Sequence, residues 1–112
     1  MNSIFDTLDL SDELRARARP LDEIGVNETA WPKTAALELL ERLHGQPIAV
    51  LGSDVLRPGA TTLAYNWDNW HSDQRPHESF GDYAARSQRD AVKYISDYSA
   101  QDSHFVLVLQ RG

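Results

Sequence analysis

The densest cluster of side chains able to bind a metal or move protons lies in the second half of the chain. Its members fall within eight residues of one another and are His71, Asp73, His77 and Glu78. Imidazole and carboxylate groups are common ligands of divalent ions, so this cluster could serve a small metal-dependent enzyme. However, the spacing matches no established ligand pattern such as His-Glu-x-x-His, and Pro76 interrupts any helix that would align the side chains. We therefore interpret the cluster as a solvated loop and keep the metal site as an alternative.

Other groups with catalytic potential lack the partners that catalysis needs. The chain has no cysteine, which excludes thiol nucleophiles, disulfides and cysteine-ligated zinc. No serine lies in a Gly-x-Ser-x-Gly sequence, and Gly52-Ser53-Asp54 lacks the lysine of a phosphate-binding loop. Asp54 could act as a general base or could cap a turn through its side chain, and we favour the turn. We expect no catalytic residue and no cofactor, and therefore a protein that is not an enzyme.

A tryptophan-rich segment from Tyr65 to His71 has the composition of a binding surface. Trp67 and Trp70 stand three residues apart among asparagine, aspartate and histidine. Tryptophan is strongly enriched at interface hot spots, and neighbouring carboxylates can pair with a basic partner. We expect one tryptophan to belong to the core and the other to be exposed. The candidate partner-binding residues are Asp54, Trp67, Asp68, Asn69, Trp70, His71 and Asp73.

The overall charge limits the kinds of partner. Seventeen acidic residues face eleven basic ones, so the net charge is −6 at pH 7. Nucleic acid would be repelled by this charge, whereas a basic protein would be attracted, although ordinary solubility also explains an acidic surface. The N-terminus has no signal-peptide pattern, and no apolar stretch approaches the roughly 20 residues that span a bilayer. We expect a cytoplasmic protein that contacts neither nucleic acid nor membrane.

The elements that would position these residues can be read from apolar spacing and from breaking residues. A length of 112 residues predicts a single domain, residues 1–112. One helical pattern begins at Ser3 and has a break near Leu10-Ser11, and a second begins at Pro32. The third and strongest helical pattern is capped by Ser79. The predicted strands are residues 48–51, 61–65 and 105–109, the last at the centre of the sheet. Residues 21–30, 52–54 and 67–76 are predicted to be connections or turns, and Arg57-Pro58-Gly59 a hairpin turn.

These elements predict an α+β fold in which a three-stranded, mainly antiparallel sheet packs against two or three helices. The strand order does not follow from the pattern.

Three features together resemble the Immunity protein 40 family of bacterial polymorphic toxin systems. They are the apolar strand leading into Gly52-Ser53-Asp54-Val55, the Asn-Trp pairs at Asn66-Trp67 and Asn69-Trp70, and the long amphipathic helix followed by an apolar C-terminal strand. The resemblance covers roughly residues 20 to 109. Ser53 stands where the family pattern has a second glycine. The resemblance implies a protein that binds and neutralises a cognate toxin domain, with no cofactor.

Three function classes therefore stay open from the sequence. The first is a toxin-neutralising immunity protein, which the family resemblance favours. The second is the metal-dependent enzyme described above, and the third is a structural adaptor subunit.

Overall fold

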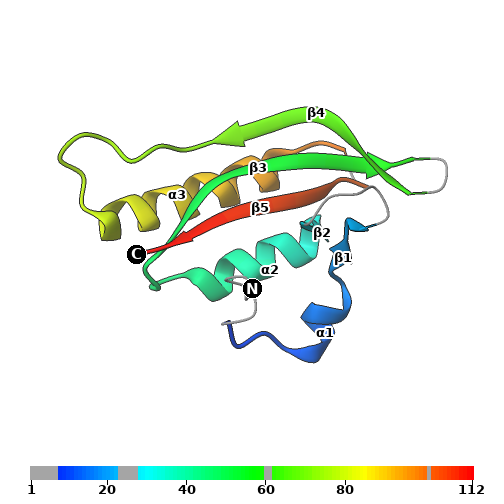
Figure 1. The fold of residues 1–112 in the computed structure, drawn as a ribbon, viewed down its shortest axis with the longest axis horizontal. Coiled ribbons are helices and arrows are strands. Elements are labelled where there is room, and N and C mark those ends of the chain that lie inside the picture. The colour runs from blue at the N-terminus through cyan, green and yellow to red at the C-terminus, as the bar shows by residue number, and fades with distance from the viewer. Residues whose placement is uncertain (1–7, 23–27, 60–61, 101) are drawn as a thin grey trace.

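The computed structural model describes residues 8–22, 28–59, 62–100 and 102–112, and in them three helices accompany a five-stranded sheet (Figure 1). The elements in chain order are α1 (Asp12–Ala16), β1 (Arg19–Pro20), β2 (Thr29–Pro32), α2 (Lys33–Leu43), β3 (Ile48–Pro58), β4 (Leu63–His71), α3 (Phe80–Asp97) and β5 (His104–Arg111). The strand order is β1-β2-β5-β3-β4, and each neighbouring pair is antiparallel. The prediction of a three-stranded sheet is therefore wrong, whereas the central place of the C-terminal strand is confirmed.

The two strands that the sequence does not predict are β1 and β2. They have two and four residues, too few to show an alternating pattern, and they fall in or beside the stretch expected to be a connection. Pairing with β5 creates β2, with Trp31 opposite Phe105. Tertiary contacts rather than local propensity therefore form these strands.

The β3–β4 hairpin is longer than the sequence predicts. Gly52, Ser53 and Asp54 lie inside β3 and not in a turn, because they pair with His71, Trp70 and Asn69 of β4. The segment expected to be irregular is consequently part of β4 as far as His71. The register shifts between Asp54 and Leu56, as it does in a β-bulge. This irregularity allows the hairpin to include residues with low strand propensity.

The two long helices agree with the sequence pattern. Pro32 precedes α2, and Gly45, with φ of 82°, lies just beyond its end. The Ser79 hydroxyl accepts a hydrogen bond from the Asp82 N–H at 3.1 Å and so caps α3. For the N-terminal helix, residues 3–7 lie outside the described residues. The helix that is described, α1, begins at the expected break, capped by Ser11.

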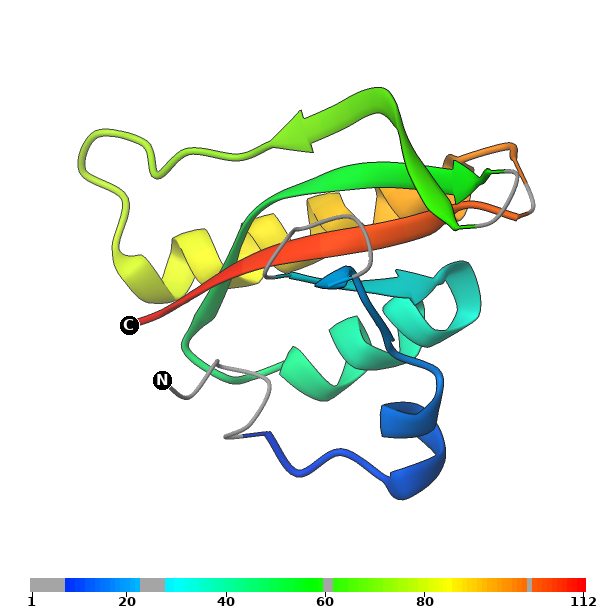
Figure 2. The ribbon, with the colours of Figure 1, turned by 45° about the vertical axis from the view of Figure 1, so that its right-hand side comes forward.

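Both long helices pack on the same face of the sheet. The main core joins α2 and α3 to inward residues of β3 and β5, such as Val55, Phe105 and Leu107. The opposite face, which we call the open face, carries a smaller cluster that includes Leu56 and Val106. Figures 1 and 2 show β4 along one edge of this sheet, with no described element beyond it.

The backbone of β3 changes its partner at Gly52. From Gly52 onward β3 pairs with β4. Before it, side chains of α3 provide the hydrogen bonds: the Val50 N–H donates to Ser87 Oγ at 2.9 Å, and Gln88 Nε2 donates to the Ile48 carbonyl at 2.8 Å. Because buried backbone groups must be paired, Ser87 and Gln88 complete the strand where β4 is absent.

Gly52 should be sensitive to substitution. A Cβ atom at this position would collide with the Trp70 carbonyl oxygen and press on His71 Cα, both backbone atoms of β4. Gly52→Ala should therefore lower the free energy of unfolding by about 1–3 kcal/mol, as overpacking does elsewhere. Urea unfolding followed by circular dichroism measures this change.

Gly81→Ala is the matched control, because a Cβ atom there meets nothing within 4 Å. Alanine is also the better helix former, so this variant should be as stable as the parent or more stable. Equal stability of Gly52→Ala and the parent would show that β4 does not approach β3 as closely as described.

Candidate partner-binding surface

Trp67 is the most exposed large apolar side chain among the described residues, at 85% of its accessible area. It lies in the middle of β4, opposite the register shift in β3, and its φ is 71°. A positive φ is rare for a bulky residue and costs on the order of 1–3 kcal/mol. Strained residues of this kind concentrate at functional sites, so Trp67 is the first candidate for a contact residue.

Tyr98, at the end of α3, fixes the residues on both sides of Trp67. Asn66 Nδ2 donates to the Tyr98 hydroxyl at 2.7 Å, and that hydroxyl donates to Asp68 Oδ2 at 2.6 Å. The Asp68 N–H in turn donates to Asn66 Oδ1 at 2.9 Å. The Trp67 ring stacks beside Tyr65 at 6.2 Å between centroids. The exposed indole is therefore held in place by its neighbours.

Trp70 points to the other face of β4. It is half-buried, packs against the main core and stacks on Tyr94 of α3, with ring centroids 6.1 Å apart. The prediction that one tryptophan is exposed is confirmed by Trp67, whereas the one expected in the core, Trp70, is only half-buried at its margin.

Four of the seven predicted site residues line one shallow hollow on the open face. Asp54, Asn69 and His71 line it together with Val108, and its volume is about 230 Å³. Trp70 also borders this hollow, although its ring stacks on Tyr94 on the other side of the sheet. Antiparallel pairing brings Asp54 opposite Asn69 although they lie on different strands. The sheet therefore brings together four of the residues that were predicted from the sequence.

The other three predicted residues lie at two separate places. Trp67 and Asp68 form the bulge further along β4. Asp73 follows the strand as an exposed residue, and its carbonyl accepts a hydrogen bond from Arg86 at 2.8 Å. The structure thus groups six of the seven residues on β4 and the adjacent part of β3.

Glu28 is a member of this surface that the sequence does not reveal. Glu28 is an exposed residue, and partial desolvation, and then the negative charge of Asp54, raise the pKa of its carboxyl. Burial and these same two carboxylates raise the pKa of the Tyr65 hydroxyl. Glu28, Asp54 and Tyr65 therefore share one negative region. Glu28 immediately precedes the unpredicted strand β2, and only the order β2-β5-β3 brings it near Asp54.

Two of the residues considered as an alternative metal site form an ion pair and hydrogen bonds with α3 instead. Glu78 forms an ion pair with Arg86, whose Nε and Nη2 lie 2.8 Å from the two carboxylate oxygens, and the two side chains are only 12% and 15% exposed. Arg86 also donates to Ser72 Oγ at 3.3 Å. Among the described residues, no group of three or more histidines and carboxylates lies close enough to hold an ion. The Glu78–Arg86 pair and the bond from Arg86 to the Asp73 carbonyl fasten the β4–α3 loop to α3.

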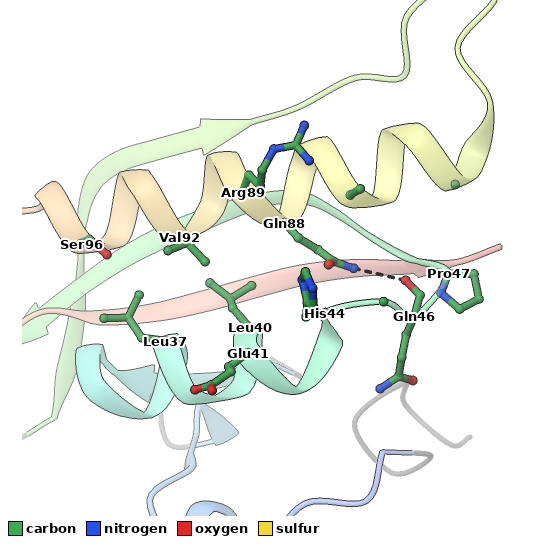
Figure 3. Close-up of a pocket in the computed structure, with 13 residues that line it drawn as sticks. Leu37, Leu40, Glu41, His44, Gln46, Pro47, Gln88, Arg89, Val92 and Ser96 are labelled. Carbon is green, nitrogen blue, oxygen red and sulfur yellow. Dashed lines mark hydrogen bonds between the residues drawn. The ribbon is translucent and has the colours of Figure 1, made fainter.

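A second concavity lies between α2 and α3, away from β4 (Figure 3). Its volume is about 810 Å³, and its walls are mainly apolar, with Leu37, Leu40 and Val92 inside and Arg89 at the rim. Gln88 Nε2 donates to the Gln46 carbonyl at 3.3 Å across one end. Beside this groove, Leu37 is half-buried and His44 is exposed.

The fold and this surface define a small α+β protein whose most distinctive surface is aromatic and acidic. The chain belongs to the Immunity protein 40 family, whose model matches residues 20–109, and it is therefore an immunity protein. Immunity proteins are generally not enzymes, and in general they have a toxin as partner. Searches of curated proteins and of solved structures found no match. No helix in the described part of the chain has the length and apolarity needed to cross a membrane.

The ion pair of Glu78 makes a testable contribution to acid stability. The hydrogen bonds from Arg86, and then the backbone N–H of Arg75, lower the pKa of Glu78 to about 2. A pKa lowered by folding contributes stability above the unfolded-state value, and this stability is lost as the pH falls toward the folded value. The melting temperature should therefore decrease as the pH is lowered from about 4.5 to about 2.

Glu78→Gln and Arg86→Gln should each remove this part of the pH dependence, because each breaks the same pair from one side. Thermal melts of both variants and the parent across the acid range provide the measurement. If the melting temperature of Glu78→Gln decreased with falling pH as steeply as that of the parent, the ion pair would not control the stability of the loop.

Proposed function

We propose that this immunity protein binds a cognate bacterial toxin domain through β4 and the adjoining sheet face, and so blocks the toxin in the producing cell. The observation that carries the proposal is Trp67. Its indole is 85% exposed on a strained bulge that Tyr98 holds in place. Burying such a ring in a partner removes a large apolar surface from water.

The charge around Trp67 supports a basic partner. Asp68 adjoins the indole in sequence, and Glu28 and Asp54 lie close enough to raise the pKa of Glu28. Lysine or arginine side chains of the partner would relieve the repulsion between Glu28 and Asp54, which would favour association. The net charge of −6 would also speed the encounter with a basic partner. A toxin domain with a basic surface, such as one that acts on nucleic acid, satisfies these requirements.

The proposed partner is the toxic C-terminal module of a secreted or contact-delivered effector of a polymorphic toxin system. Neutralisation would need no chemistry by this chain, because a tightly bound protein can cover or plug the toxin's site. We propose that it acts in the cytoplasm, without membrane or nucleic acid. An adaptor role is the competing proposal, and an obligate partner that is not toxic would favour it.

Trp67→Ala should weaken toxin binding by about 30-fold or more, which corresponds to the roughly 2 kcal/mol of an interface hot spot. The toxin is sought first as the product of the adjacent upstream open reading frame. Calorimetric titration of that product with the parent and variant measures the affinities. Circular dichroism should show an unchanged fold, because the indole is exposed.

Val92→Ala is the control, since Val92 is 39% exposed and lines the groove between α2 and α3, on the side of α3 that faces α2 (Figure 3). It should bind as the parent does. A neighbour that is neither toxic nor bound would end the proposed function. Binding that is unaffected by Trp67→Ala but lost in Val92→Ala would instead move the contact surface to the groove.

A further inference from the structure

We propose that the toxin domain adds an extended segment to the free edge of β4, and that a basic side chain of this segment enters the hollow between β4 and α3. This inference rests on the proposed function and specifies how the partner is held. Adding a strand to an exposed sheet edge is a common recognition mode, in which backbone hydrogen bonds supply affinity and side-chain pockets supply specificity.

The register of β4 shows which of its backbone groups are free. The Ser72 N–H donates to the Leu51 carbonyl of β3 at 2.8 Å, and Trp70 pairs with Ser53. Alternate residues of a strand direct their N–H and C=O groups to the same side. The backbone groups of Asn69 and His71 therefore face away from β3. In the described part of the chain no strand pairs with that side.

The bulge at Trp67 sets the limits of this free stretch. Its positive φ interrupts the regular strand on one side of Asn69, so an added segment pairs only beyond it. The exposed indole then borders the pairing stretch. A short pairing region beside a large aromatic anchor suits a partner that contacts both.

Hollows lie on both faces of this stretch. The hollow on the open face lies beside Asn69 and His71, as described above. The other, of about 390 Å³, lies between β4 and α3. Its lining residues are Trp70, Asp90, Lys93, Tyr94, Asp97 and Tyr98. Since successive side chains of a strand point to opposite faces, an added segment would direct its side chains alternately toward the two hollows.

The lining of the α3-side hollow favours a cation. Trp70 and Tyr94 are stacked, and aromatic faces attract guanidinium and ammonium groups. Two carboxylates, Asp90 and Asp97, are available at its rim. Their present partners are weakly held: Lys93 lies 3.1 Å from Asp97 with both side chains largely exposed, and Arg86 lies 3.6 Å from Asp90. An arginine of the partner can replace Lys93 and also contact the rings.

Proline substitution separates backbone pairing from side-chain contact. Asn69→Pro and His71→Pro each remove an outward N–H, which an edge strand tolerates, whereas Asn69→Ala and His71→Ala keep it. The proline variant at each position should bind the product of the adjacent open reading frame at least about tenfold more weakly than the alanine variant at that position. Trp70→Pro removes an inward N–H and should destabilise the fold itself.

Amide exchange of the unsubstituted protein, followed by NMR, gives a readout that does not depend on the folding of any variant. The Asn69 and His71 amides should exchange rapidly in the free protein and become protected in the complex, while the Ser72 amide is protected in both. Equal affinities of the proline and alanine variants, or unchanged exchange at Asn69 and His71 in a formed complex, would overturn the edge-pairing model. Protection of both amides in a toxin-free dimer would show that a second copy occupies the edge. Failure of the unsubstituted protein to bind would instead contradict the proposed function.

Discussion

The change of partner along β3 at Gly52 is the constraint on which the binding surface depends. Up to Leu51 the strand lies beside α3, and Ser87 and Gln88 satisfy backbone groups of Val50 and Ile48. From Gly52 onward, β4 supplies the pairing, and the missing Cβ lets its backbone approach closely. This arrangement makes β4 the edge of the sheet. It also leaves hollows beside β4, one on the open face and one toward α3.

The surface built on β4 contains features that reduce the stability of the free protein. An exposed indole, a positive φ at a bulky residue and two carboxylates that repel one another each carry a cost. The hydroxyl of Tyr98 maintains the bulge from the end of α3. Features of this kind are expected where a partner removes the cost on binding. The groove between α2 and α3 is larger and mainly apolar, but it has no comparable strained or clamped residue among those described.

The sequence predicted the elements whose signals are local. Apolar spacing and caps define α2 and α3, and a continuous apolar run defines β5. It did not predict β1 and β2, nor the full lengths of β3 and β4, because these strands depend on pairing between distant residues. The same limit applies to the site. The residues of the Tyr65–His71 segment were recognisable by composition, whereas Glu28 and the contact of Tyr98 with Asp68, thirty residues away, exist only in the folded chain.

A crystal structure of this protein bound to the toxin domain of the neighbouring gene would test most directly whether β4 is the contact surface. The expected complex buries Trp67, places the partner against the outer edge at Asn69 and His71, and leaves the α2–α3 groove open. A complex in which Trp67 keeps the 85% exposure of the free protein while the partner fills the groove beside Leu37 and Val92 would contradict this assignment.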